Sequence, residues 1–356
     1  MHSAHTLNSD GRMQYPEEFY STFRQYWDWI ATTDHDYSID AAKWQDIVQS
    51  ADARNDEGFV SLIGYEWTSS SWGHMSVIFR GDPPLKADGL ASSSDPAYDT
   101  PRKLYDFLRL GNGLAAFAHP ALPGCSIDFG KEPDYRDDGI AALAGIFGFN
   151  DTIHWNAMWD YANGSEAPIS VNGATQGTGW IKNALERGYR LGFVGELDMH
   201  AKKLDPMSYR YTGVVANGLT REGIFEALRM RHAYAVSSPS GLGKTILLRA
   251  DADDHLMGDV FNSESNTLKV ILRGKTDLER FGLVNVFVNG RIVESRPVSG
   301  QNLVESFNVN LPDDDNYAFF EVKALAADGQ VSQAITSPMY VVVRGGKEHT
   351  DIGPGE

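Results

Sequence analysis

The chain has 356 residues, a formal net charge of −17 at pH 7 and a single cysteine, Cys125. This length accommodates one large domain and a smaller one, each with its own core. The negative charge argues against a nucleic-acid-binding surface because phosphate would be repelled. The lone cysteine excludes a disulfide framework and a thiolate zinc site. No apolar run approaches the roughly 20 residues that span a bilayer.

The first two thirds of the chain alternate between helical and strand-like patterns. Pro16-Glu17-Glu18 is typical of a helix start, with a proline and two acids in the first turn. In chain order, further helices are expected over 39–53, 102–110, 180–187 and 220–229, and strands over 29–33, 59–65, 75–79, 114–118, 141–149 and 191–194. Residues 81–99 are rich in Pro, Asp and Ser and predict a long loop. The alternation predicts an α/β fold with a parallel barrel over residues 1–240.

The pattern changes beyond Ser240. Short alternating apolar runs follow one another, and turns such as Asn289-Gly290 and Asp328-Gly329 separate several of them. Such turns favour β-hairpins, so a small all-β sandwich is predicted over residues 241–344. Residues 345–356 are expected to form a disordered tail.

Six of the ten histidines lie in short clusters beside acidic residues, mostly where an expected strand ends. The clusters contain His2, His5 and Asp10, then Asp34, His35 and Asp36, then Glu66 and His74, then His119, and last Asp198 and His200. Histidine and carboxylate are the ligands that borderline divalent metals prefer. Since strand ends of a barrel meet at one rim, the pattern predicts a metalloenzyme.

Each of these residues also has a structural interpretation. Taken alone, His119 before Pro120 is more often structural than a ligand, and the Asp198 and His200 pair is a common surface pattern. Glu66 is more suggestive, because a carboxylate that closes a buried strand needs a partner. Lys202 and Arg210 either bind an anionic part of the substrate or belong to a solvated loop. Taken jointly, the clusters favour the metal site.

The clusters also resemble a known family. The segments that carry the likeness are His5-Thr-Leu-Asn-Ser-Asp-Gly11, Thr33-Asp-His-Asp36, Gly64-Tyr-Glu-Trp-Thr68 ahead of Gly73-His74, Ala118-His-Pro120, Asp198-x-His200, Glu186–Phe193, Leu219–Arg229 and Ser337–Val341. In this order and spacing they resemble the polymerase and histidinol phosphatase (PHP) superfamily. Within it the sequence is most similar to the DUF3604 branch, near the CehA/McbA-type metallohydrolases.

The resemblance implies a distorted seven-stranded, TIM-like barrel with two or three divalent ions, of zinc, manganese or iron, at the strand ends. The matching ligand positions are His5, Asp10, His35, Glu66, His74, His119, Asp198 and His200, with His2 as a further candidate. Glu66 would bridge two ions, while Asp34 and Asp36 would fix the orientation of His35.

The implied activity is hydrolysis of a phosphoester or a related carboxylic or carbamate ester in a small or oligomeric anionic substrate. A metal-activated hydroxide would attack phosphorus or a carbonyl carbon, with Asp34, His35 and Glu66 as the catalytic residues. Two other classes stay open. One is a carbohydrate-active lyase or hydrolase on acidic sugars, and the other is a degenerate barrel that binds a ligand without turnover.

The first motif departs from the family pattern of two histidines one residue apart. Counting back from His5, the first histidine falls on Ser3, whereas His2 is offset by one residue. Only Met1 precedes His2, which leaves the first barrel strand without sequence. Three interpretations fit: the chain is a fragment whose missing start also hides a signal peptide, His2 reaches the metal by a local adjustment, or one metal position is lost. Localisation therefore stays open between the cytoplasm and an exported form.

Overall fold

The computed structural model describes residues 3–5, 15–81, 90–120, 127–130, 134–147, 170–171, 174–175, 181–196, 198, 209–238, 245–312 and 314–343. Among the helices of this part of the chain, none combines the length and the apolar character needed to cross a membrane.

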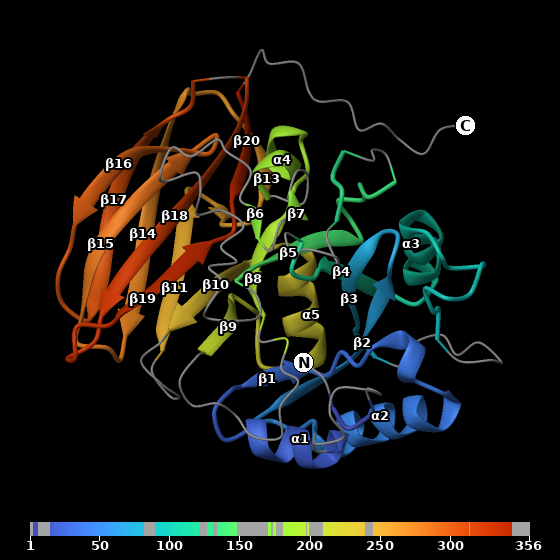
Figure 1. The fold of residues 1–356 in the computed structure, drawn as a ribbon. Helices are drawn as coiled ribbons and strands as arrows, with labels where there is room; N and C mark the ends of the chain where they lie inside the picture. Colours follow the sequence, from blue (N-terminus) through green and yellow to red (C-terminus); the bar gives the residue numbers. More distant parts are fainter. Residues whose placement is uncertain are drawn as a thin grey trace.

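The N-terminal half is built on a curved, open sheet of six strands in the order β1-β2-β3-β4-β5-β8 (Figure 1). Its strands are β1 (Trp29–Ala31), β2 (Val60–Ser69), β3 (Gly73–Phe79), β4 (Gly113–Phe117), β5 (Ala141–Phe147) and β8 (Gly192–Gly195). The pairs β1–β2, β4–β5 and β5–β8 are parallel, whereas β3 runs antiparallel to β2 and β4. We call this sheet the half-barrel. A separate two-stranded pair joins β6 (Ser170–Val171) to β7 (Ala174–Thr175).

Within the described residues, five α-helices and one short 3-10 helix accompany the half-barrel. They are α1 (Pro16–Phe23), η1 (Asp36–Ser38), α2 (Ala41–Arg54), α3 (Pro101–Leu110), α4 (Ile181–Glu186) and α5 (Arg221–Arg229). The side chain of Asp40 accepts a hydrogen bond from the backbone N–H of Lys43 at the start of α2, and Thr220 accepts one from Gly223 at the start of α5. Both contacts satisfy donors that the first helical turn leaves free. The expected helices over 39–53, 102–110, 180–187 and 220–229 are thus confirmed to within two residues.

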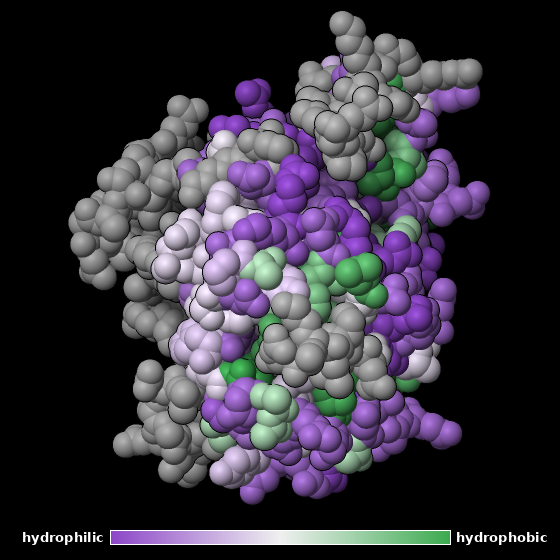
Figure 2. Space-filling view, turned by 90° about the vertical axis from the view of Figure 1, so that its right-hand side faces the viewer, coloured by the Kyte–Doolittle hydropathy of each residue, from purple (hydrophilic) through white to green (hydrophobic). Residues whose placement is uncertain are grey.

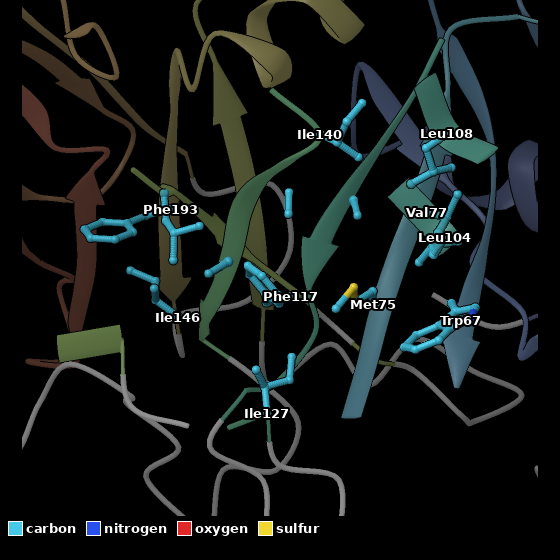
Figure 3. Close-up of a cluster of buried hydrophobic side chains, with 14 of the residues drawn as sticks. Trp67, Met75, Val77, Leu104, Leu108, Phe117, Ile127, Ile140, Ile146 and Phe193 are labelled. Atoms are coloured by element: carbon cyan, nitrogen blue, oxygen red, sulfur yellow. The ribbon is translucent and has the colours of Figure 1, made fainter. Parts of the chain in front are cut away.

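The two faces of the half-barrel differ in what they bury. On the outer face, Trp67, Met75, Val77 and Phe117 belong to the same buried cluster as Leu104 and Leu108 of α3, and Phe193 lies on the other side of this cluster, toward the C-terminal strands (Figure 3). On the inner face, alternate residues of the same strands pack against α5 instead. Because side chains of a strand alternate between the two faces, the strand register decides which functional residues point inward. The side of the molecule that Figure 2 shows is mostly hydrophilic, as expected for a solvent-facing surface.

The expected distorted, seven-stranded TIM-like barrel is wrong, because the described strands form an open, six-stranded sheet that ends at β1 and β8. β8 approaches β9 (Tyr209–Val214), but the Thr212 hydroxyl, in place of a backbone ladder, bonds both the N–H and the C=O of Gly195. β9 instead pairs with β10 (Ala233–Ser238), which pairs with β19 (Val331–Thr336) of the C-terminal region. The molecule is consequently mostly β-structure.

The C-terminal region consists of two packed sheets. Their remaining strands are β11 (Ile246–Ala252), β12 (His255–Leu256), β13 (Val260–Ser263), β14 (Thr267–Thr276), β15 (Arg280–Val288), β16 (Arg291–Pro297), β17 (Asn302–Asn310), β18 (Asp315–Leu325) and β20 (Met339–Val343). One sheet has eight strands, including β9 and β10, and the other has four, in the order β12-β11-β14-β17. A continuous apolar cluster fills the space between them. β8, at the edge of the half-barrel, and β9 and β10, at the edge of the eight-stranded sheet, lie between the other strands of the two regions (Figure 1).

The C-terminal region also fixes the strand that leads to the candidate site. The Tyr340 hydroxyl accepts a hydrogen bond from the N–H of Leu191 (2.7 Å) and donates one to its C=O (2.8 Å). Ser337 Oγ accepts from the N–H of Phe193, whose ring lies edge-on to that of Phe319, with 5.5 Å between the ring centroids. The position of β8 therefore depends on both halves of the chain.

Candidate metal centre

Glu66, His74 and His119 converge on the inner face of the half-barrel. One ligand atom from each lies within 4.8 Å of the others. His74 Nδ1 is 2.7 Å from Glu66 Oε1, and His119 Nε2 is 3.5 Å from the same oxygen. These three residues come from β2, β3 and the end of β4, so three neighbouring strands supply the group that the sequence predicts.

The strand register explains this convergence. Outer-face residues of β2 such as Tyr65 and Trp67 belong to the core, so Glu66 between them points to the inner face. In the antiparallel β2–β3 pair Thr68 lies opposite His74, which places the His74 ring beside Glu66. His119 lies two residues after the end of β4, and the N–H of the intervening Ala118 donates to the His74 carbonyl (3.1 Å).

His35 lies at the edge of this group. Its Nδ1 is 3.6 Å from Glu66 Oε2 and 2.8 Å from Thr68 Oγ1. An isolated parallel bridge joins His35 to Glu66, and the N–H of Glu66 donates to the carbonyl of Asp34 (2.9 Å). The His35 ring also stacks on Tyr37, with 5.1 Å between centroids. His35 therefore contacts the central carboxylate from the β1 side.

The group is buried and electrostatically coupled. Glu66 is 2% exposed and His119 is 7% exposed. Burial by itself lowers the pKa of His119, but its hydrogen bond to Glu66 and the charges of Glu66, Asp198 and Glu196 outweigh burial and raise that pKa to about 9. The surroundings thus favour a positive charge at this point, which a metal cation would supply as well as a proton.

One further observation fits a metal. His119 Nδ1 is buried without a hydrogen-bond partner among the described residues, and such an atom needs an explanation, for instance an ion or a water. A donor set of imidazole and carboxylate suits zinc, manganese or iron. The residues present therefore fit a divalent ion.

Glu196 is a member of the site that the sequence analysis missed. Glu196 as a whole is half-buried, but its carboxyl group faces inward. Its Oε2 accepts a hydrogen bond from the N–H of His119 (3.3 Å). Gly145 makes room for it, since a Cβ there would come within 2.5 Å of the Glu196 carboxyl carbon. Desolvation raises the pKa of Glu196 to about 7. The signal was the one that identified Glu66, namely a carboxylate directly after a buried strand.

A cavity of about 470 Å³ adjoins part of this group. Glu66, His119, Glu196 and Asp198 line one part of it, and Arg210 on β9 lines it as well. Asp198 adds negative charge that raises the pKa of both His119 and Glu196. Arg210 and these acidic residues therefore border the same cavity.

The remaining predicted residues have other contacts. His5 Nε2 lies 2.6 Å from Asp46 Oδ2, and its ring is edge-on to that of Tyr15. Asp34 accepts hydrogen bonds from the N–H (2.6 Å) and the hydroxyl (2.7 Å) of Ser3.

Asp36 accepts from the backbone N–H groups of Tyr37, Thr68 and Ser93, which ties η1 to β2 and to the loop that follows β3. The predicted positions His2, Asp10, His200 and Lys202 lie outside the described residues.

Comparison with known proteins gives one sequence-family match. A family model described as "Protein of unknown function (DUF3604)" matches residues 9–123, which confirms the expected DUF3604 relationship over that segment. Glu66, His74 and His119 all lie within it. No curated protein matches the chain.

Two solved structures show a distant likeness. An endonuclease Q in complex with a 27-mer duplex substrate that carries an abasic lesion has 12% identity and a TM-score of 0.37, with 64% of this chain and 54% of that chain covered. An engineered protein has 12% identity and a TM-score of 0.21, with coverages of 85% and 70%. The chain therefore spans about half the length of the endonuclease Q chain, and at these TM-scores neither structure bears on function.

Proposed function

We propose that this protein is a metal-dependent hydrolase of the PHP type, related to the CehA/McbA-type enzymes, that acts on a phosphoester or a related ester. The observation that carries the proposal is the convergence of Glu66, His74 and His119, with ligand atoms within 4.8 Å of one another on three adjacent strands. The DUF3604 match over residues 9–123 supports it, because the match contains all three residues.

Divalent ions bound here would lower the pKa of water and stabilise negative charge on the substrate. Glu66, His74 and His119 would hold the ions, and Glu66, which touches both histidines and lies close to His35, is placed to bridge two of them. We propose that the site binds two or three ions per chain. Asp10 and His200, which would complete such a site, lie outside the described residues.

Proton transfer requires a group that exchanges protons near neutral pH. Glu196 meets this condition, since its pKa is raised to about 7 by desolvation and its carboxyl group lines the same cavity as Glu66. His35, beside Glu66, is the second candidate from the β1 side. Arg210 lines the cavity and is placed to attract an anionic substrate.

The proposal is tested by metal content and activity together. Elemental analysis of the purified chain after incubation with zinc, manganese or iron should show at least one ion per chain, and the loaded protein should hydrolyse a phosphoester. His74→Ala should lose most of the bound metal and the activity. His255→Ala is the matched control, because His255 lies on β12, outside the group around Glu66.

Two outcomes would contradict the proposal. A chain that binds no divalent ion under any of these conditions is not a metallohydrolase. A chain that keeps its metal after His74→Ala binds it elsewhere, and the group around Glu66 would then need another explanation.

A further inference from the structure

The cavity beside the metal centre continues along the inner face of the half-barrel. Its volume is about 470 Å³, within the range of about 300–1,000 Å³ that small-molecule pockets have. Its wall away from the acidic residues is formed by Ile78, Ala116, Leu143, Val194, Ile224 and Leu228. These six side chains come from β3, β4, β5, β8 and α5 and are all apolar. We call this part of the space the inner cavity.

Two alanines on strands of the half-barrel line this space beside the larger apolar residues. Here Ala31 on β1 and Ala116 on β4 contribute only methyl groups to the wall. The inner cavity is bordered near solvent by Tyr26 and Leu247, which are 39% and 52% exposed. A ligand therefore has a route into it.

The polar groups of the cavity are distributed unevenly. Glu66 on β2, His119 after β4, and Glu196 and Asp198 after β8 form one charged group, whereas α5 contributes the apolar Ile224 and Leu228. The other charged residues of the lining are Asp28, just before β1, and Arg210 on β9. A molecule that fills the whole space would need a polar, metal-binding group at one end and an apolar body at the other. Burial of an apolar chain in such a space is favourable by about 0.8 kcal/mol for each methylene, which corresponds to roughly a fourfold gain in affinity.

We propose that the substrate is an amphiphile: a phosphoester of an aliphatic alcohol, whose phosphate lies at the Glu66 cluster and whose alkyl chain occupies the inner cavity. This inference rests on the proposed function for the position of the phosphate. The position of the chain rests on the shape and the lining of the inner cavity alone. Arg210, in the same cavity, complements the negative charge of the phosphate.

The test uses alkylphosphonates, which resemble alkyl phosphates but are not hydrolysed. Calorimetric titration of the metal-loaded protein with methyl-, butyl- and octylphosphonate should show an affinity that rises on the order of 100-fold from butyl to octyl. The heat capacity of binding should become more negative with chain length, as burial of apolar surface requires. Equal affinities across the series would overturn the inference. Failure of octylphosphonate to bind, while methylphosphonate binds, would also overturn it, because the cavity would then not admit the chain.

Two variants locate the chain. Ala116→Leu should fill the inner cavity and lower the ratio of octyl to methyl affinity at least tenfold. Leu143→Ala should widen it and shift the preference toward a longer chain, which keeps the inference testable if Ala116→Leu fails to fold. Leu110→Ala is the control, because Leu110 is 82% exposed at the end of α3 and lies outside the cavity. An unchanged ratio in Ala116→Leu would place the chain elsewhere and overturn the inference.

The experiment separates this inference from the proposed function. Octylphosphonate binding that keeps its chain-length dependence in a protein that binds no metal would uphold the inner cavity and reject the hydrolase. If the protein hydrolyses ethyl phosphate in a metal-dependent way but binds all the alkylphosphonates equally well, the hydrolase is upheld. The inner cavity is then rejected as the site of the alkyl chain.

Discussion

At the scale of single residues, two of the predicted ligands hold an uncommon backbone conformation. His119 has φ of 30° and Asp198 has φ of 40°, in the left-handed region that costs most residues about 1 kcal/mol or more. His119 lies shortly after the end of β4, and Asp198 lies shortly after the end of β8. His119 contacts Glu66 and Glu196, and Asp198 interacts electrostatically with His119 and Glu196. The chain thus accepts local strain where it gathers its charged groups.

This strain predicts the relative stability of two variants. His119→Gly should be more stable than His119→Ala by about 1 kcal/mol, because glycine adopts positive φ without a Cβ clash. Urea unfolding of both variants, in chelator to exclude metal effects, measures the difference. The same pair of substitutions at Tyr26, which is not among the residues with positive φ, should show the opposite order or no difference. Equal stabilities at position 119 would mean that the bend carries no strain.

Glu196 gives a prediction on pH dependence. Its pKa is raised to about 7 in the folded chain from an ordinary value of 4.5, so the folded state binds more protons than the unfolded state between these values. Stability in the absence of metal should therefore fall as pH rises from about 5 to about 8.

The variant Glu196→Gln checks the sign. It should be more stable than the parent chain at pH 8, by on the order of 1 kcal/mol after allowance for solvent screening, with little or no gain at pH 5. Thermal unfolding in chelator at both pH values is the measurement. Glu222→Gln, an exposed carboxylate paired with Arg80, serves as the control. A gain of equal size at both pH values would show that the Glu196 carboxyl group is not the cause.

At the scale of elements, the link between β8 and the C-terminal region is specific. The buried Tyr340 hydroxyl satisfies both the N–H and the C=O of Leu191, just before β8. Tyr340→Phe would leave two buried backbone groups without that partner, which costs about 1–3 kcal/mol. We expect urea unfolding to show this loss in a single transition. Tyr15→Phe, at a residue that is 61% exposed, should change stability little, and a loss confined to one of two separate transitions would show that the halves unfold independently.

The elements also show how far the sequence alone leads. The runs 59–65 and 75–79 were expected as strands, and they form β2 and β3 with Glu66 and His74 on one face. These are local, periodic signals. Closure of the barrel was predicted wrongly because it depends on long-range pairing: β9 joins β10, and β10 joins β19 about a hundred residues later. The alternating pattern within one strand does not indicate which distant strand will pair with it, and no strand is predicted from the sequence over residues 209–214.

At the scale of the whole molecule, the candidate metal centre joins strands that otherwise meet only edge to edge. Glu66, His74 and His119 come from β2, β3 and the end of β4, and His35 adds the segment after β1. An ion that binds the folded chain and not the unfolded chain stabilises it by mass action, by about 2.7 kcal/mol at a hundred times its Kd. Metal binding and the stability of the half-barrel should therefore be linked.

This linkage is tested by thermal unfolding at increasing metal concentration. The Tm of the parent chain should rise with the logarithm of free metal once it exceeds Kd, and excess chelator should reverse the rise. His74→Ala should flatten the response and also lower the Tm in chelator, because the variant removes the ring whose Nδ1 lies 2.7 Å from Oε1 of the buried Glu66. A metal-dependent Tm that survives in His74→Ala would place the stabilising ion at another position. A flat response in the parent chain, beside measurable metal content, would mean that the ion binds the unfolded chain equally well and that the half-barrel holds these four residues together without it.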